Sequence, residues 1–374
     1  MTIEVLRRID EEMTRLMSSL YDLRFQRNTL LPISRPPTEI LAEIFVRGAR
    51  DHHHMSYCEP AMGTPKWVNV SYVCRQWRDV ALNCPTLWSH PFMGSPWCTK
   101  VLLARSGRVP LKICIGISFQ LQQWSGQFRP FMEKVADRAE HIQELCLHLW
   151  DLYTCLVAFL RPCSRAPRLQ VLEIRGHGPL SSVERIFNGE TPSLRKLDLT
   201  NVDMPWHSFQ LSNLISLSVE NVRNPFQPTM VEHLTALRSM HDLVDLHLCD
   251  ALPSARSFLA DADINTFQTV NLPHLSRLLI HAPLSTVVAF LSCVNMPPGA
   301  EMKLYCEDED ETIPDVYFRL SFLLAQRFRA STDQVTSVPT IRMLAIDFGC
   351  DKALFSASER DCGHVHYHDE RNKY

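Results

Sequence analysis

The stretch WVNVSYVCRQWRDVALNCPTLW, residues 67–88, decides how the first part of this chain folds. Its apolar residues recur at spacings of three and four, which is typical of one face of an α-helix, and they are Val70, Val73, Cys74, Trp77, Val80 and Ala81. The spacing predicts an amphipathic helix of about three turns over residues 68–81, with polar side chains on its other side. Pro85 cannot continue a helix, so we expect the chain to leave it near Cys84.

A second helix is predicted just upstream, in PTEILAEIF, residues 37–45. Pro37 suits the first turn of a helix, and Glu39 suits the positive end of the helix dipole. Gly48 is the predicted end of this helix. A second apolar stripe runs along it, formed by Ile40, Leu41, Ile44 and Phe45.

Together the two segments resemble an F-box. In that family a P-x-E-I-L-x-x-I-F helix precedes a helix of the form V-C-R-x-W-R-x-x-A, which is followed by P-x-L-W. The chain carries this pattern at Pro37, Glu39, Ile40, Leu41, Ile44, Phe45, Val73, Cys74, Arg75, Trp77, Arg78, Ala81, Pro85, Leu87 and Trp88. It departs from the pattern in two places: Pro36 stands where the family usually has Leu, and the loop over residues 50–66 is longer.

The resemblance implies that residues 32–92 form a helical F-box-like domain that binds a Skp-type adaptor protein. That adaptor connects F-box proteins to a cullin-based ubiquitin ligase. The apolar edges of the two helices are the expected adaptor-binding surface, with the candidates Pro37, Ile40, Leu41, Ile44, Val73, Trp77 and Leu87. For Val73 and Leu87, the alternative is a place inside the core of the F-box itself.

Residues 1–31 are predicted to form a long helix with a heptad seam. Its positions alternate spacings of three and four and are interrupted by one charged residue; they are Leu6, Ile9, Met13, Leu16, Leu20, Leu23, Arg27 and Leu30. One interpretation is a coiled coil that makes a homodimer. The other is a long helix that packs back on its own F-box or frays.

A motif of the form L-x-x-L-x-L recurs through residues 93–350. Successive copies start 20 to 32 residues apart, at Ile142, Leu169, Leu194, Leu214, Leu243 and Leu275, and a last copy starts at Ile341. These intervals bracket the leucine-rich-repeat period, although the buried Asn that usually follows such a strand is missing at its register. Because one such unit cannot close its own core, stacked units must share one.

The expected fold class is therefore α/β. An N-terminal helical coiled-coil segment and a helical F-box precede an irregular leucine-rich-repeat-like α/β solenoid, and residues 351–374 form a polar C-terminal tail. A non-repetitive α/β domain is the alternative for the repeat region.

The polar residues within and just after each repeat strand are the candidate substrate-binding surface. Side chains alternate sides along a strand, so the residues between and after the leucines should face the concave side of the solenoid. The candidates are His148, Glu173, Arg175, Asp198, Thr200, Glu220, His247 and His281. Their mixed charge favours a segment of an unknown protein substrate as the ligand. The alternative is a merely solvated row, with substrate bound by loops.

Composition narrows the remaining function classes. The formal net charge is −3 and basic residues do not cluster with aromatic ones, so we expect no nucleic-acid partner. No run of 18 apolar residues appears and the N-terminus lacks a signal peptide, which favours the cytoplasm or nucleus and no membrane. The 13 cysteines are scattered singly, as expected in a reducing compartment.

No catalytic or cofactor motif is present in the sequence. It has no Gly-rich phosphate loop, G-x-S-x-G elbow or H-E-x-x-H pair. Histidines gather over residues 52–54 and at His364, His366 and His368, but both groups fall in predicted loops, so we expect no metal.

The resemblance therefore implies a substrate-recognition adaptor that is not itself an enzyme. The arrangement of N-terminal helix, F-box-like segment and irregular repeats resembles the F-box families expanded in mushroom-forming fungi. A protein-interaction scaffold that works outside any ligase is the alternative.

Overall fold

The computed structural model describes residues 2–55, 66–91, 96–116, 125–149, 165–176, 187, 190–202, 211–222, 227–253, 269–307, 314–329 and 344–348. The chain divides into two compact units, Met1–Glu144 and Leu145–Tyr374. The predicted C-terminal tail and the start of the last predicted repeat lie outside the described residues. Among the described helices, none has the length and apolar content needed to cross a bilayer.

The first unit is mainly helical. Its elements are α1 (Thr2–Thr29), η1 (Pro32–Ser34), α2 (Thr38–Met55), η2 (Lys66–Asn69), α3 (Val70–Val73), α4 (Arg75–Leu82), η3 (Pro85–Trp88), α5 (Pro96–Ser106), β1 (Leu111–Gly116), α6 (Ser125–Ala136), η5 (Ala139–His141) and the first residues of β2 (Ile142–Leu149). The long N-terminal helix and the helix after Pro37 are thus present as predicted.

The single helix predicted over residues 68–81 is wrong, because the chain breaks it at Cys74. This residue has extended backbone angles, φ −155° and ψ 173°, and its Sγ accepts the N–H of Trp77 at 3.5 Å, so it caps α4. Arg78 Nε donates to the carbonyl of Ser71 at 2.9 Å. That carbonyl would otherwise accept the N–H of Arg75, so a side chain replaces the missing helical bond across the break.

Helix α2 also runs further than predicted. Gly48 does not end it, and the helix continues to Met55. An added Cβ on Gly48 would meet nothing within 4 Å, and the next residue, Ala49, is buried in the core. Burial of Val46 and Ala49 on either side of Gly48 offsets the weak helix propensity of one glycine, which amounts to about 1 kcal/mol.

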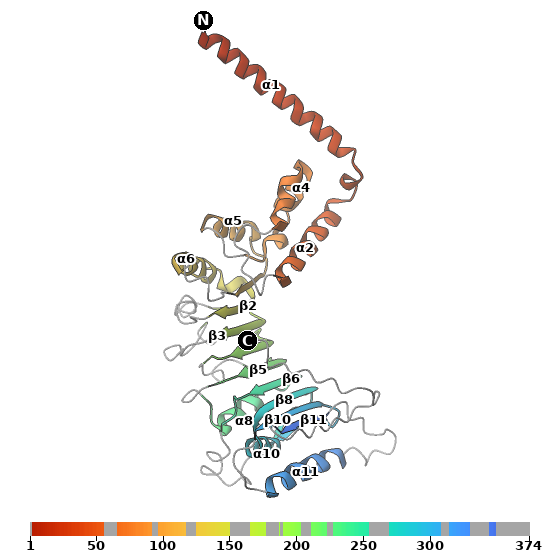
Figure 1. Ribbon diagram of the computed structural model, residues 1–374, viewed down its shortest axis with the longest axis vertical. Coiled ribbons are helices and arrows are strands. Elements are labelled where there is room, and N and C mark those ends of the chain that lie inside the picture. Colours follow the sequence, from red (N-terminus) through yellow and green to blue (C-terminus); the bar gives the residue numbers. More distant parts are fainter. Residues whose placement is uncertain are drawn as a thin grey trace. The chain divides into compact units, whose positions relative to one another are not determined.

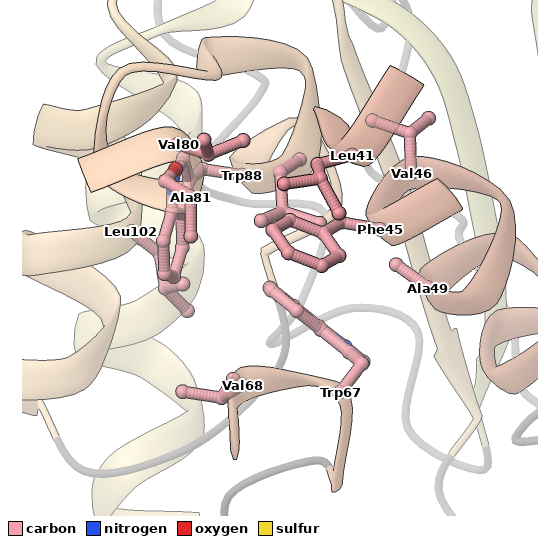
Figure 2. Close-up of a cluster of buried hydrophobic side chains, with 11 residues drawn as sticks. Leu41, Phe45, Val46, Ala49, Trp67, Val68, Val80, Ala81, Trp88 and Leu102 are labelled. Atoms are coloured by element: carbon pink, nitrogen blue, oxygen red, sulfur yellow. The ribbon is translucent and has the colours of Figure 1, made fainter. Parts of the chain in front are cut away.

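The core of the first unit lies between α2, η2, α4, η3 and α5 (Figure 2). It contains Leu41, Phe45, Val46, Ala49, Trp67, Val68, Val80, Ala81, Leu87, Trp88 and Leu102. The rings of Trp67 and Trp88 lie 5.4 Å apart at 58°. Trp88 Nε1 donates to the carbonyl of Ala81 at 2.8 Å, so this fully buried indole has its polar atom satisfied.

The first unit extends past residue 92, where the sequence places the end of the F-box. Leu102 on α5 belongs to the same core, and the Arg105 guanidinium lies 4.5 Å from the Trp88 ring centroid. The backbone N–H of Lys112 donates to the carbonyl of Ser89 at 2.9 Å. These contacts join α5 and β1 to the helices before them, so the compact unit ends only at Glu144.

The second unit is built on a parallel sheet. Its strands are β3 (Val171–Gly176), β4 (Lys196–Thr200), β5 (Ser216–Glu220), β6 (Asp245–Cys249), β8 (Arg277–Pro283), β10 (Glu301–Glu307) and β11 (Leu344–Phe348), and they lie side by side in that order (Figure 1). All the pairings from β3 to β11 are parallel. Two short strands, β7 (Val270–Asn271) and β9 (Val294–Asn295), form a separate pair.

Helices accompany this sheet towards its later strands. They are α8 (Met230–Arg238), α10 (Leu284–Cys293) and α11 (Pro314–Arg329). Thr229 and Glu232 form a reciprocal capping box at the start of α8. Helix α10 packs against β8 and β10 and also contacts α11. The segments 150–164 and 177–186, where helix-like spacing is also visible in the sequence, lie outside the described residues.

The apolar residues of the L-x-x-L-x-L copies form the inner side of the sheet, as predicted. In the six copies that start between residues 142 and 275, every one of these residues is at most 2% exposed. The strands are in register so that equivalent residues lie beside each other, for example Leu172, Leu197, Leu217, Leu246 and Leu278. Met302 and Leu304 continue this pattern in β10, where they are 6% and 1% exposed.

A left-handed residue follows three successive strands. Asn201, Asn221 and Asp250 have φ values of 54°, 55° and 48°. Each donates its backbone N–H to a carbonyl of the next strand of the sheet at 2.8–2.9 Å: Asn201 to Glu220, Asn221 to Cys249, and Asp250 to His281. Asn and Asp tolerate this conformation better than other residues with a Cβ. The same short turn is therefore repeated at one edge of the sheet.

Candidate adaptor-docking surface and polar strand row

The start of α2 determines which of its side chains face outward. The carbonyl of Pro37 accepts the N–H groups of Ile40 and Leu41, both at 3.1 Å, which sets the first turn. With 3.6 residues per turn, Leu41 and Phe45 then fall on the face that meets α4, and Ile40 and Ile44 fall beside it. Leu41 and Phe45 are 1% and 4% exposed, whereas Ile40 and Ile44 are both 52% exposed.

Two further apolar side chains of this domain are exposed on α3. Tyr72 is 70% exposed and Val73 is 58% exposed. The guanidinium of Arg78 lies 5.9 Å from the Tyr72 ring centroid. We name Ile40, Ile44, Tyr72 and Val73 the docking set. Exposed aliphatic and aromatic side chains on a folded helical core are the kind of surface that a protein partner covers.

The predicted adaptor-binding residues divide between surface and core. Pro37, Ile40, Ile44 and Val73 are exposed, so the interior alternative for Val73 is wrong. Leu41 and Leu87 are each 1% exposed and lie in the core, so their assignment to the docking surface is wrong. Trp77 is half-buried, with its ring 5.0 Å from that of Phe45. The sequence stripe contains both inward and outward residues because it is wider than the contact with α4.

Helix α1 keeps its heptad seam exposed. The side chains of Leu6, Ile9, Met13, Leu16, Leu20 and Leu23 are 41–61% exposed. Two contacts place the end of α1 beside α4: Arg75 lies 3.9 Å from Asp22 Oδ1, and its guanidinium lies 5.6 Å from the Phe25 ring centroid. The seam is therefore uncovered in the single chain, and the coiled coil stays a prediction.

On the sheet, the polar residues opposite the leucines fall in two register rows. One contains Glu173, Asp198, Ser218 and His247, and the other contains Arg175, Thr200, Glu220, Cys249 and His281. We call these residues, together with His148 on β2, the polar row. The structure thus brings together all eight predicted substrate-binding candidates on neighbouring strands.

An ion-pair network occupies the first half of the polar row. His148 Nε2 lies 2.9 Å from Glu173 Oε1, and Arg175 Nε lies 3.1 Å from the same oxygen. Arg175 Nη2 also donates to Asp198 Oδ2 at 3.1 Å, so one guanidinium bridges two carboxylates on adjacent strands. Thr200 Oγ1 donates to the other Asp198 oxygen at 3.4 Å.

The network shifts the pKa values of its members. The hydrogen bond from His148 lowers the pKa of Glu173, and Arg175 adds to this against the opposing effect of burial. Burial opposes the charge of Arg175, but Asp198 and Glu173 outweigh it and raise the pKa of the guanidinium. The pairing also covers part of the row: Asp198 is only 6% exposed, so the prediction that it faces open solvent is wrong.

The second half of the row is centred on His247. Its Nδ1 lies 3.4 Å from Ser218 Oγ and 3.5 Å from Glu220 Oε1, and its Nε2 lies 3.0 Å from Cys249 Sγ. Burial and the nearby Glu220 and Asp250 carboxylates raise the pKa of Cys249 to about 12. Its sulfur is therefore a protonated thiol at neutral pH and not an activated nucleophile.

Further along, His281 Nδ1 lies 3.0 Å from Asp250 Oδ1, and its ring is 6.3 Å from that of Tyr305. Tyr305 is 38% exposed and extends the row onto β10, a position that the sequence reading did not include. The sequence does contain a signal for this position, because Tyr305 directly follows the buried Leu304 just as His281 directly follows the buried Ile280.

No group of three His, Cys, Asp or Glu side chains that could hold a metal ion occurs within the described residues. The predicted loop and tail histidines are not covered by this statement, because the side chains of residues 52–54 and the segment with His364, His366 and His368 lie outside what the structure describes.

Comparison with known proteins assigns a family to part of this chain. Residues 35–94 match the F-box-like family model. The match covers α2, η2, α3, α4 and η3, and so includes the docking set and every core residue except Leu102. No curated protein and no solved structure matched the chain.

Proposed function

We propose that this protein is the substrate-recognition subunit of a cullin-based, SCF-type ubiquitin ligase. F-box domains in general bind Skp-type adaptors of such ligases, and residues 35–94 are an F-box-like domain. The observation that carries the proposal is the docking set, because Ile40 and Ile44 stay half exposed next to a closed core. In this role the chain does no bond chemistry. It holds a substrate near the ubiquitin-loading enzyme and so raises the substrate's local concentration.

The adaptor-docking part is tested with one charge placed at three positions of α2. Ile44→Asp buries a carboxylate against the adaptor, so we expect capture of a Skp-type adaptor by the full chain to fall at least thirtyfold. This corresponds to ~2 kcal/mol for one interface side chain. Arg50→Asp introduces the same group at an exposed polar position and should leave capture unchanged. Leu41→Asp should unfold the first unit, because Leu41 is in its core.

Circular dichroism of each variant separates loss of docking from loss of fold. If Ile44→Asp is folded and still captures the adaptor as the native chain does, the docking assignment is wrong. The alternative function, an interaction scaffold outside any ligase, predicts that native purification recovers neither adaptor nor cullin.

The substrate is proposed to bind the polar row. The row spans neighbouring strands, carries both signs of charge, and includes partly exposed side chains at Thr200, His281 and Tyr305. Mixed charge with an aromatic residue suits a polar protein segment, which is the ligand class we propose. Glu173 and Asp198 are already paired with Arg175. We therefore expect the partly exposed side chains of the row, Thr200, His281 and Tyr305, to decide which substrate binds.

A steric test spares the ion-pair network. Thr200→Arg with His281→Arg places two long side chains over the row, and the acids near each position, Asp198 and Asp250, can accept the added charge. The matched control is Thr235→Arg with His241→Arg, at exposed positions on and after α8. Affinity purification with the ligase arrested downstream should show loss of bound proteins in the first variant only, with the adaptor retained in both. Equal sets of bound proteins would exclude the row as the substrate site.

A homodimer through α1 is the last part of the proposal. The exposed apolar seam supports it, because six large apolar side chains in heptad spacing face solvent in the single chain.

A further inference from the structure

The charged residues beside the seam of α1 carry information about its partner. In heptad notation, Leu6, Met13, Leu20 and Arg27 occupy position a, and Ile9, Leu16 and Leu23 occupy position d. The flanking e positions then hold Ile3, Asp10, Met17 and Arg24, and the g positions hold Val5, Glu12, Ser19 and Gln26. Residues at e and g set the orientation and register of coiled coils, because they meet across the seam.

The ion pairs within α1 leave two of these flanking charges unused. Arg7 and Arg8 pair with Glu4, and Arg7 also pairs with Glu11, all on the side away from the seam. Within the described residues, Asp10 and Arg24 form no ion pair. They have opposite sign, lie on the same flank of the seam, and are available to a second helix.

The two side-chain contacts described between the F-box and α1 lie on the outer side of the helix. Asp22 and Phe25, which meet Arg75, occupy heptad positions c and f. The F-box therefore fixes the back of the helix near its end and leaves both the seam and its flanking charges open to a second copy.

We propose that α1 pairs with α1 of a second copy in an antiparallel coiled coil centred on Ser18, an inference that rests on the homodimer proposed above. In this register residue 6 lies level with residue 30 of the other copy, 9 with 27, 13 with 23, and 16 with 20. At the a positions, Met13, Leu20 and Arg27 thus each face a d position. Leu6 lies level with Leu30, the residue that follows the end of α1. Asp10 of each copy meets Arg24 of the other. The two helices are therefore joined by two identical ion pairs, as a two-fold interface requires.

A parallel pair makes poorer use of the same residues. There the g residue of one helix faces the e residue of the next heptad on the other, which pairs Val5 with Asp10 and Ser19 with Arg24, without complementary charge. It also places Arg27 beside its own copy at position a, where two like charges repel in the seam. In the antiparallel pair the two Arg27 side chains lie at opposite ends, next to Asp10 of the second copy.

The arrangement determines where the two F-boxes go. Because each F-box contacts the outer side of its own helix, the two F-boxes lie on opposite outer faces of the pair and towards opposite ends. The docking sets of the two copies then do not compete for one adaptor, and the dimer has two independent adaptor sites.

Distances between labels test the orientation in the full chain. A nitroxide is attached to a noncanonical amino acid at position 8 or 18, so that the 13 native cysteines are not labelled. Position 8 lies ten residues from the centre of the register, so the two labels are offset by about 30 Å along the axis at 1.5 Å per residue. Labels at position 18 have no axial offset. Position 18 is an f position on the outer face of each helix, so the separation of the axes, about 10 Å, the two helix radii and the label arms together set this distance, which stays shorter than the one at position 8.

The expected result is a long distance at position 8 and a short one at position 18, in a protein that light scattering shows to be a dimer. A dimer with short distances at both positions overturns the antiparallel inference and leaves the homodimer in place. A monomer at the concentration of the measurement overturns the homodimer and the inference with it. In both of these cases the adaptor test above is unaffected.

A charge exchange gives an independent readout. In the antiparallel dimer, Asp10→Arg alone replaces each of the two ion pairs by a pair of arginines. The dissociation constant of the dimer should then rise roughly three- to tenfold at low salt. The double variant Asp10→Arg with Arg24→Asp restores both pairs with reversed polarity and should restore the native dissociation constant. If the single variant dimerises as well as the native chain, or the double variant fails to recover, the proposed Asp10–Arg24 contact is wrong.

Discussion

The left-handed residue at Asn221 gives a sharp test of the repeated turn. The residue has a φ of 55°, and its backbone N–H donates to the carbonyl of Cys249 at 2.8 Å, so its conformation joins the end of β5 to the end of β6. A residue with a Cβ in this region costs about 1–2 kcal/mol, less for Asn and nothing for Gly. We therefore expect Asn221→Gly to be nearly neutral, Asn221→Ala to destabilise by ~1 kcal/mol and Asn221→Val by ~2 kcal/mol or more.

The order Gly, Ala, Val is the informative result, because it is the reverse of the usual preference of a strand for β-branched residues. The matched control is Ser216→Val at the start of β5, where the extended backbone accepts valine and no loss is expected. Because the chain has two compact units, urea unfolding followed by circular dichroism should be combined with hydrogen exchange at the β5 and β6 amides. If the β5 and β6 amides exchange as slowly in Asn221→Val as in Asn221→Gly, the left-handed residue does not limit stability and the reasoning is wrong.

Three further predictions follow from buried or paired groups. Trp88→Phe removes the hydrogen bond to the Ala81 carbonyl and leaves unfilled volume, so thermal unfolding should report a loss of ~1–3 kcal/mol; an unchanged midpoint would contradict it. The hydrogen bond from His148 is the main cause of the lowered pKa of Glu173. The ionised carboxylate therefore stabilises the folded chain fully at pH values above the ordinary pKa of a glutamate, and this stabilisation is lost as the pH falls through the lowered pKa. The free energy of unfolding in urea should accordingly fall less steeply from about pH 6 to about pH 3 in Glu173→Gln than in the native chain. Cys249, with a pKa of about 12, should remain unmodified by a maleimide at neutral pH in the folded chain, and peptide mapping that finds it labelled would exclude the buried thiol.

The strands could be predicted from the sequence because their signal is local. Each copy places its leucines two and three residues apart, and a parallel strand that buries one side needs only that alternation. The left-handed turn is also visible in the sequence, as L-x-L-x-N at Asn201 and L-x-L-x-D at Asp250, but the usual leucine-rich-repeat pattern has its buried Asn at another register. The positive φ and the exposed side chain of Asn221 show that the turn serves the backbone instead.

The break in the helix at Cys74 and the membership of the docking set could not be predicted, because both depend on tertiary contacts. The break at Cys74 requires Arg78 to reach the Ser71 carbonyl, and no periodicity reveals such a bond. Leu41 and Ile40 are adjacent in the same apolar stripe, so only the position of α4 decides which of them is buried. In the polar row the residue types were visible, but the pairing of Arg175 with two carboxylates needed the strand register.

The order of the strands from β3 to β11 has a consequence for how the second unit comes off the ribosome. In the sheet from β3 to β11 each new strand docks beside one that has already been synthesised, so no strand of this sheet waits for a distant later segment before it can pair. The growing edge is always the newest strand, and its exposed backbone groups are covered within the next few dozen residues. A chain built this way can begin to fold before its C-terminal end exists, and a pause in translation leaves a shorter sheet of the same kind.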